Sequence, residues 1–315
     1  VLAFIHSTTS GEKRIWQSRT LSQTALYVTT SVIIVALVSV LYFANAKPMF
    51  ASKTLIEGIT PRVDGNVAKN LEALKRALAY KTFGDSEIRE YLAQTTTRVI
   101  AIPEVPSDVK TSFATFAQEE LDIQLKKIPN DTRYLMFAAV LANSVGNYEG
   151  ALSYLKRAQE SSPGKQAVYF EMGTSYLRMG RNDDALMAFK QAYELEPNFE
   201  SAHIIYAVGA LYAGQDALAQ ELLSSLPEQV YYFDDRIFQA YAQRREFNRL
   251  LEILDKRIAQ NPDDVTNHLN RAGVYLEMGN RQASITELQE VIRLNPDFKK
   301  QGDRYISEIR AGRNP

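Results

Sequence analysis

The feature that most constrains the fold of this chain is a period of 34 residues that recurs through its second half. Glycine and alanine repeat at this spacing, and prolines follow one another at intervals of 34, 34, 30, 35 and 34 residues. A fixed period of this length is typical of a helical solenoid, in which each helix pair buries its apolar face only against neighbouring pairs. The repeating residues are Gly146, Gly180 and Gly214, then Ala151, Ala185 and Ala219, and then Pro129, Pro163, Pro197, Pro227, Pro262 and Pro296.

The unit from Gln166 to Pro197 shows the repeat most clearly. Two amphipathic helices are predicted, with a turn at Gly180 between them. The apolar faces carry Tyr169, Met172, Gly173 and Tyr176 in the first helix and Ala185, Phe189 and Ala192 in the second. Small residues at Gly173 and Ala185 let the two helices approach closely. We therefore expect Gly173→Leu to overpack this pair and to cost about 1–3 kcal/mol of stability.

This unit resembles the tetratricopeptide repeat, whose W-x2-L-G-x2-Y…A-x3-F…P pattern it follows with Tyr for Trp and Met for Leu. The resemblance covers residues 132–296 in five units. The unit ending at Pro227 is shortened, and the next has Arg245 where glycine is usual and Leu250 where alanine is usual. The resemblance implies an all-α fold, a right-handed α-solenoid of tetratricopeptide-like helix pairs over residues 129–296.

Further helices flank the repeats. Residues 47–128 are predicted as a linker and leading helices, with helices over 66–80, 86–95 and 107–128, because apolar residues recur there at i, i+3 and i+4. Residues 297–315 are predicted to hold a C-terminal capping helix from Asp303 to Arg310, with Gly302 just before it. A solenoid needs such caps, because its last unit would otherwise expose an apolar face.

An apolar segment precedes the helical part. No charged residue lies between Arg19 and Lys47, and residues 25–46 are predominantly apolar. As a helix this segment would be roughly 33 Å long, enough to cross a bilayer. We therefore predict a transmembrane helix over 25–46. A secretory signal peptide is the alternative, because Ala44-Asn45-Ala46 resembles a cleavage site, although the uncharged run exceeds the usual length of such a signal.

The residues before this segment indicate its direction. Val1 to Ile5 form an apolar run that we interpret as the end of a preceding membrane segment, the alternative being an artefact of where the sequence starts. The following stretch up to residue 24 carries Lys13, Arg14 and Arg19 against Glu12, which is typical of a cytoplasmic loop. The sequence thus predicts a single span in a bacterial inner (cytoplasmic) membrane, with the repeats outside the cytoplasm.

Composition and motifs give no candidate for catalysis. The chain has no cysteine and three histidines, and it contains no phosphate-binding loop, dinucleotide fingerprint, nucleophile elbow or zinc-protease motif. We predict no catalytic, metal or cofactor-binding residue within it. Its net charge of -1 argues against nucleic acid as a partner. His203 and His268 occupy equivalent places in two first helices, and we expect both to serve packing between repeats.

Binding is the expected role of the repeats. By the register of the resembled family, the inner face is built by the first helix of each unit. Chaperone-binding members clamp a carboxylate there with lysine, arginine and asparagine, whereas apolar side chains dominate here. An apolar groove suits a protein or peptide partner, the alternative being that a leading helix of the chain fills it. The expected lining residues are Met136, Val140, Asn143, Phe170, Thr174, Leu177, Ile204, Val208, Leu211, Asp235, Gln239 and Leu269.

The order of segments resembles the C-terminal region of bacterial O-antigen ligase/polymerase-like membrane proteins that carry tetratricopeptide repeats. The resemblance is carried by GEKRIWQSR before the apolar segment, LEALKRALAYKTFGDSEIREYLAQ after it, and the terminal EIRAGRNP. It implies an extracytoplasmic protein-interaction scaffold attached to a glycan ligase or polymerase. That family's catalytic residues lie in an earlier external loop, and no position here matches it. A stand-alone membrane-anchored adaptor that organises an envelope complex is the alternative.

Overall fold

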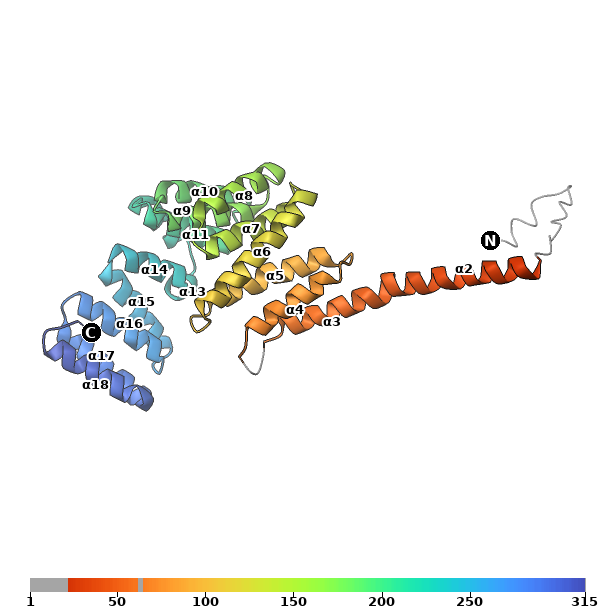
Figure 1. Cartoon of the computed structure of the whole chain (residues 1–315). Helices are drawn as coiled ribbons and strands as arrows, with labels where there is room; N and C mark the ends of the chain where they lie inside the picture. Colours follow the sequence, from red (N-terminus) through yellow and green to blue (C-terminus); the bar gives the residue numbers. More distant parts are fainter. Residues whose placement is uncertain (1–21, 62–64, 315) are drawn as a thin grey trace, which may run out of the picture. The chain divides into compact units, whose positions relative to one another are not determined.

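The structure is a computed structural model that describes residues 22–61 and 65–314. The predicted preceding apolar run and most of the basic loop lie outside these residues. The described chain is helical, with no strand in the ranges given, and it forms two compact units, Val1–Tyr91 and Leu92–Pro315 (Figure 1). The predicted class, one long apolar helix followed by repeated helix pairs, is confirmed. Each unit is described below by itself.

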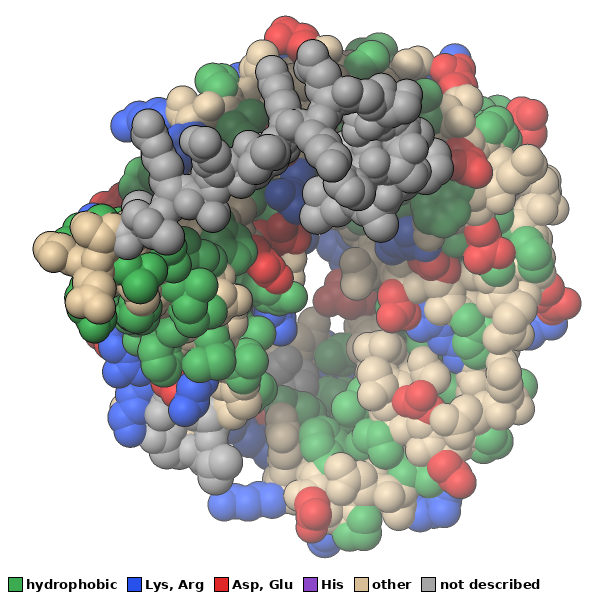
Figure 2. Space-filling model, turned by 90° about the vertical axis from the view of Figure 1, so that its right-hand side faces the viewer, with side chains coloured by type: hydrophobic (Ala, Val, Ile, Leu, Met, Phe, Trp, Pro, Cys, Tyr) green, Lys and Arg blue, Asp and Glu red, His purple; other side chains and the backbone are tan. Residues whose placement is uncertain are grey.

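The first unit begins with one continuous helix. Ser22 caps its N-terminus, its hydroxyl accepting a hydrogen bond from the Ala25 N–H at 3.2 Å. The helix runs through α2 (Gln23–Leu41), a single π-helical turn η1 (Tyr42–Ala46) and α3 (Lys47–Ile59). Among the described residues, this is the one helix long and apolar enough to cross a membrane. Its side chains in α2 are almost all exposed, and Figure 2 shows this helix end-on with hydrophobic side chains around it.

The helix does not stop where the sequence predicted a linker to begin. Pro48 has no N–H and its ring would clash with the carbonyl of Ala44, four residues earlier, so a regular α-helix would kink or break here. Instead the chain widens into the π-helical turn, in which the Lys47 N–H donates to the Tyr42 carbonyl. Such a turn lets the helix continue past a proline. α3 is therefore a direct extension of α2.

α3 packs in a hairpin against α4 (Ala68–Ala79). Gly58 is the contact point, because a Cβ there would lie 2.7 Å from the Cγ of Leu74. The buried Asn70 then closes the end of α3: its Nδ2 donates to the carbonyls of Gly58 at 2.9 Å and Thr60 at 2.8 Å. These carbonyls would otherwise have no partner at the helix C-terminus.

The second unit starts within α5 (Asp85–Ala101), a helix longer than the one predicted over 86–95. α6 (Ser107–Lys127) follows and packs on the first repeat helix. Successive antiparallel pairs then form the solenoid (Figure 1). The pairs are α7 (Thr132–Ser144) with α8 (Tyr148–Ser161), α9 (Gln166–Arg178) with α10 (Asn182–Leu195), α11 (Glu200–Tyr212) with α12 (Asp216–Ser224), α14 (Asp235–Arg244) with α15 (Phe247–Gln260), and α16 (Val265–Glu277) with α17 (Arg281–Leu294).

Every pair turns on one residue in the left-handed region. Gly146, Gly180, Gly214 and Gly279 have φ between 69° and 79°, and the N–H of the residue that follows each of them bonds back to a carbonyl five residues earlier. Glycine adopts this conformation without the penalty that a Cβ imposes. In the fourth pair Arg245 takes the same position, with φ 58°. The geometry of the repeat is thus retained without its glycine.

Arg245→Gly should therefore stabilise the chain. Removing the Cβ relieves left-handed strain of about 1 kcal/mol, and the exposed ion pair lost with Glu277 contributes little. Urea denaturation, followed by circular dichroism, measures the difference. Arg245→Ala is the matched control, because it removes the same guanidinium but keeps the strained backbone, and it should not stabilise. Equal effects of the two variants would contradict this explanation.

The C-terminal end follows the same pattern. After a short 3-10 turn η2 (Pro296–Phe298), α18 (Lys299–Arg310) begins earlier than predicted and contains Gly302 rather than following it. Gly302 lies inside the helix because a Cβ there would be 2.7 Å from the Cγ1 of Ile292. Ile306 and Ile309 are buried in the last core cluster, so α18 covers α17 as a cap should.

Candidate functional site

An apolar groove lies on the face of the first helices α9, α11 and α14. Its volume is about 630 Å³. We define the apolar groove by its lining residues, Phe170, Thr174, Leu177, Arg178, Phe189, Phe199, Ser201, Ile205, Val208, Tyr212, Arg236, Gln239 and Gln243. The rings of Phe170 and Phe199 stack with their centroids 6.3 Å apart, and Phe199 is exposed. Aromatic rings held in this way offer a large apolar surface to a partner.

The charge of the apolar groove is one-sided. Arg178 and Arg236 are the two charged residues that line it, and no carboxylate joins them in this set of described residues. Arg236 is held in place, its Nε donating to Asp234 Oδ1 at 3.0 Å and its Nη2 to Oδ2 at 2.6 Å. Burial disfavours the charged form of Asp234, but the hydrogen bonds and the positive charge of Arg236 outweigh it and lower the pKa of this carboxyl. Arg178 forms no ion pair with a described residue, so its charge is available.

Five of the predicted partner-binding residues line this groove: Phe170, Thr174, Leu177, Val208 and Gln239. The others lie elsewhere. Ile204 is a core residue of α11, because neighbouring helices cover it. Leu211 is also buried but borders a second cavity, and Asp235 borders a third one with Gln239. The remaining four are half-buried: Met136, Val140 and Asn143 on α7, and Leu269, which packs on the C-terminal cluster. The leading helix α6 contributes no residue to the groove.

Asn143 belongs to a polar contact between α7 and α9 instead. Its Oδ1 accepts from the Ser175 hydroxyl at 2.9 Å, and its Nδ2 donates to Glu171 Oε2 at 3.4 Å. Burial raises the pKa of the Glu171 carboxyl, and the Asn143 hydrogen bond only partly offsets this. A carboxyl whose pKa rises on folding favours the folded state at low pH, and this advantage is lost as pH increases through that pKa.

Glu171→Gln should therefore raise the melting temperature at neutral pH, because the glutamine carries no charge to bury. The gain should shrink as the pH falls and vanish below about pH 4, where both states of the wild type are protonated. Thermal melts across this range test it. Glu160→Gln, on an exposed part of α8, should show no such trend. A gain that does not depend on pH would contradict the assigned cause.

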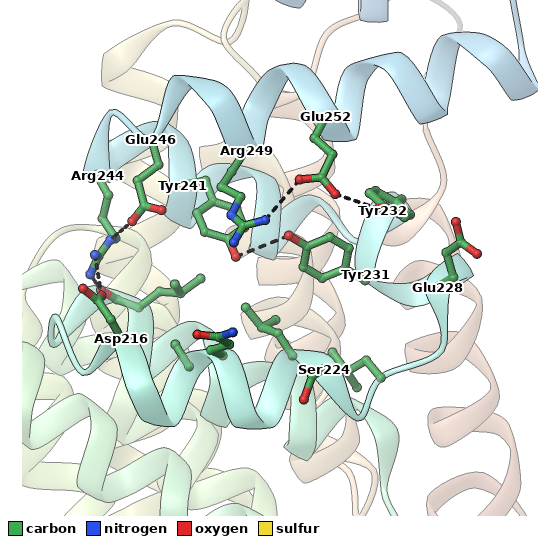
Figure 3. A pocket seen from close by; sticks show the side chains of 15 residues that line it. Asp216, Ser224, Glu228, Tyr231, Tyr232, Tyr241, Arg244, Glu246, Arg249 and Glu252 are labelled. Carbon is green, nitrogen blue, oxygen red and sulfur yellow. Dashed lines mark hydrogen bonds and ion pairs between the residues drawn. The ribbon is translucent and has the colours of Figure 1, made fainter.

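A second cavity, which sequence reasoning missed, lies on the other side of α14. Its volume is about 790 Å³. We call it the tyrosine slot and define it by Leu211, Asp216, Ala219, Gln220, Leu223, Ser224, Leu226, Glu228, Tyr231, Tyr232, Tyr241, Arg244, Glu246, Arg249 and Glu252. Figure 3 shows α12 on one side of the slot, and on the other Arg249 with the hydroxyls of Tyr231 and Tyr241 turned toward each other.

The slot exists because one repeat is shortened. α12 spans 9 residues, whereas α8, α10, α15 and α17 each span 14. The extra helix α13 (Glu228–Phe233) follows, and α14 then packs on α11. α8 and α10 each pack along the next first helix, but no comparable packing joins α12 to α14 in this described part of the chain. The interval of 30 residues before Pro227 was the sequence signal for this gap.

Hydrogen bonds order the wall opposite α12. The Tyr232 hydroxyl donates to Glu252 Oε1 at 2.8 Å, and this bond raises the pKa of Tyr232 to about 12. Arg249 Nη1 donates to the other oxygen of Glu252 at 3.2 Å. Tyr241 is only 5% exposed, and burial raises the pKa of its phenol. All three tyrosines therefore present neutral hydroxyls at physiological pH.

The arrangement of side chains fits binding rather than catalysis. Within the described ranges, no three His, Cys, Asp or Glu side chains are placed to hold a metal ion. His203 lies beside Tyr193, with its Nε2 3.0 Å from the Leu222 carbonyl. His268 is buried against Glu287. Both histidines thus contact neighbouring helices, as expected for packing.

Comparison with known proteins identifies the repeats. Residues 167–199 and 265–298, which form α9–α10 and α16–α17, match the tetratricopeptide repeat family. A tetratricopeptide repeat protein from Parabacteroides merdae superposes with a TM-score of 0.54 at 15% identity, covering 82% of this chain and 98% of that one. The chain therefore carries tetratricopeptide repeats in a helical solenoid, as the sequence pattern implied.

Two further relatives are more distant. A Drosophila melanogaster homologue of the BBSome complex member BBS4 is 22% identical over 196 residues, which is 58% of this chain and 40% of that protein. The chain thus spans less than half the length of this relative. YrrB, described as a TPR protein with an unusual peptide-binding site, is 18% identical with a TM-score of 0.38, covering 57% of this chain and 94% of that one.

Proposed function

We propose that this chain is a membrane-anchored interaction scaffold whose apolar groove holds a protein or peptide partner outside the cytoplasm. The observation that carries the proposal is the groove itself, with stacked exposed phenylalanine rings on a solenoid that holds no described metal or catalytic constellation. Helical repeats present such rigid concave surfaces for partner binding. The chemistry of the groove also narrows the class of partner.

The proposed partner is an apolar segment that carries acidic residues. Leu177, Ile205 and Val208 favour burial of aliphatic or aromatic side chains. Arg178 and Arg236 at the rim favour carboxylates, which Arg can bind with two parallel hydrogen bonds. A basic segment would face two uncompensated positive charges and would be rejected.

A random peptide library displayed on phage and selected against the full chain in nanodiscs tests this proposal. Selected peptides should combine large apolar residues with Asp or Glu. Their affinity should fall by about tenfold for Phe170→Asp, which places a charge on the apolar floor, and by several-fold for Arg178→Glu. Lys190→Glu makes the same charge change outside the groove and should have no effect. Peptides that bind all four proteins equally would rule out the apolar groove as their site.

Anchoring in the membrane rests on the continuous apolar helix Gln23–Ile59. α2 and η1 contain no charged residue, and Tyr42, Phe43 and Lys47 follow where interfacial side chains are expected. The absence of cysteine allows a clean test of topology. Ala167→Cys, exposed on α9, should react with a membrane-impermeant maleimide in intact spheroplasts. Protection until the cells are lysed would place the repeats in the cytoplasm, and loss of the helix from the mature protein would show a cleaved signal.

In its finer form, the proposal makes the chain part of an O-antigen ligase/polymerase-like surface-glycan assembly protein, where the scaffold would recruit partners to a glycan-transferring enzyme. Its support is the order of basic segment, apolar helix and repeats in the sequence. The alternative is a stand-alone adaptor of an envelope complex. The mass of the endogenous polypeptide in detergent-extracted membranes separates them: tryptic peptides from further membrane helices favour the first, and a mass matching these 315 residues favours the second.

A further inference from the structure

The tyrosine slot is a place where a helix is missing from the packing of the solenoid. The second helices α8 and α10 are each covered by the first helix of the next unit, but α12 is not. One flank of α12 therefore faces the slot through Ala219, Gln220 and Leu223. Gln220 is exposed and forms no hydrogen bond with a described residue. This flank is free to receive a helix from another molecule.

The end of the slot near the start of α12 has a surplus of negative charge. Arg244 lies between Asp216 and Glu246 and donates to both, with Nη2 2.6 Å from Asp216 Oδ1 (Figure 3). One guanidinium thus faces two carboxylates. The Asp216 side chain is 73% exposed and uses only Oδ1 in this contact, so Oδ2 can accept from a ligand. Over the whole slot, four carboxylates face two guanidiniums.

The opposite wall adds aromatic rings. Tyr231 and Tyr232 pack edge to face with centroids 4.8 Å apart, and Tyr241 lies beside them. Tyrosine faces attract cations, and the cluster already does so on its outer side, where Lys256 Nζ lies 5.2 Å from the Tyr232 ring centroid. The hydroxyls of Tyr231 and Tyr241 are 3.5 Å apart, and at most one can donate to the other. A donor therefore remains for a ligand.

We propose that the tyrosine slot is a second docking site, which takes an amphipathic helix of a partner protein carrying an arginine or lysine. The apolar face of that helix lies on Ala219 and Leu223 of α12, and its cation reaches Asp216 and Glu246. This site differs in charge from the apolar groove, whose rim is positive. α14 separates the two, with Gln239 and Gln243 facing the groove and Tyr241 and Arg244 facing the slot. The scaffold would then hold two chemically different partners.

Fluorescence anisotropy with the full chain in phosphatidylcholine nanodiscs tests the second site. The probe is a labelled helical peptide of about 16 residues with leucines on one face and arginines beside them. Its counterpart has glutamine for each arginine, and empty nanodiscs give the background. The arginine peptide should bind about fivefold tighter than its counterpart, the contribution of about 1 kcal/mol expected of an exposed cation site. The difference should shrink with added salt.

Variants locate the site. Asp216→Asn should remove most of the preference for arginine, and Gln220→Trp should abolish binding of both peptides by filling the slot. Gln191→Trp introduces the same ring on an exposed part of α10 and should change nothing. Phe170→Asp, which disables the apolar groove, should also leave binding intact, so failure of one site is distinguished from failure of the other. Equal binding of the two peptides, binding by neither, or binding unaffected by Gln220→Trp would each overturn the proposal.

Discussion

Gly173→Leu is expected to lower the free energy of unfolding by about 3 kcal/mol, the upper end of the usual cost of overpacking. The Phe189 ring of α10 is wedged between α9 and α11 and contacts a glycine on each. A Cβ at Gly173 would lie 2.1 Å from Cε1 of this ring, and one at Gly209 would lie 2.8 Å from Cδ2. The ring is buried and has no free space into which to move. Urea denaturation of the full chain in detergent measures the loss.

Gly273 in α16 gives the matched control. It lies in the first helix of another repeat, and a Cβ there would meet no atom within 4 Å. Gly273→Ala should therefore stabilise the chain by about 0.5–1 kcal/mol, the helix-propensity gain, whereas Gly173→Ala should destabilise it. Opposite signs for the same substitution in two repeats would be hard to explain without the Phe189 contact. A neutral Gly173→Leu would show that the register of α9 against α10 is wrong.

Glu287→Ala is expected to cost about 3 kcal/mol, because it removes the shared partner of two buried cationic groups. Glu287 Oε2 lies 2.8 Å from His268 Nδ1, and Oε1 lies 2.9 Å from Arg271 Nη2. The His268 Nε2 lies 3.0 Å from the Pro262 carbonyl, so both ring nitrogens face acceptors. Without the carboxylate, Arg271 keeps only Asp255. Thermal and urea denaturation measure the effect.

Glu290→Ala controls for the loss of a glutamate from α17. Glu290 pairs with Arg293 one turn away, but this pair is in contact with solvent, so its loss should change stability little. A double variant, Glu287→Gln with Arg271→Met, should recover part of the loss because it removes a buried charge along with its partner. If Glu287→Ala and Glu290→Ala behaved alike, the buried network would have no structural role.

The repeats could be predicted from the sequence because their physical determinants are local and periodic. Gly180 turns the chain in the left-handed region, Gly173 accepts the Phe189 ring, and Ala185 is buried, each in the role that its spacing indicated. Even the irregular unit followed the pattern, since Arg245 adopts the conformation of the missing glycine. Here the same short motif specifies both the helix boundaries and the contact face.

Other features depend on tertiary contacts that a period does not contain. The helix continues past Pro48 because a π-helical turn accommodates the proline and because α4 packs on α3. Equivalent positions in the repeat also differ: Phe170 lines the apolar groove, whereas Ile204 is covered by neighbouring helices. The tyrosine slot arises from a contact that α12 fails to make. The shortened interval marked its place, but its walls come from four helices.

The apolar groove is the central claim, and photocrosslinking in native membranes tests it most directly. A benzophenone amino acid at Thr174, exposed within the groove, should form a defined adduct with a partner. The same residue at Lys190, exposed on α10, should form none. The Thr174 adduct should disappear when Phe170→Asp is added in the same chain. Adducts from Lys190 but not from Thr174, or a Thr174 adduct that survives Phe170→Asp, would contradict partner binding in this groove.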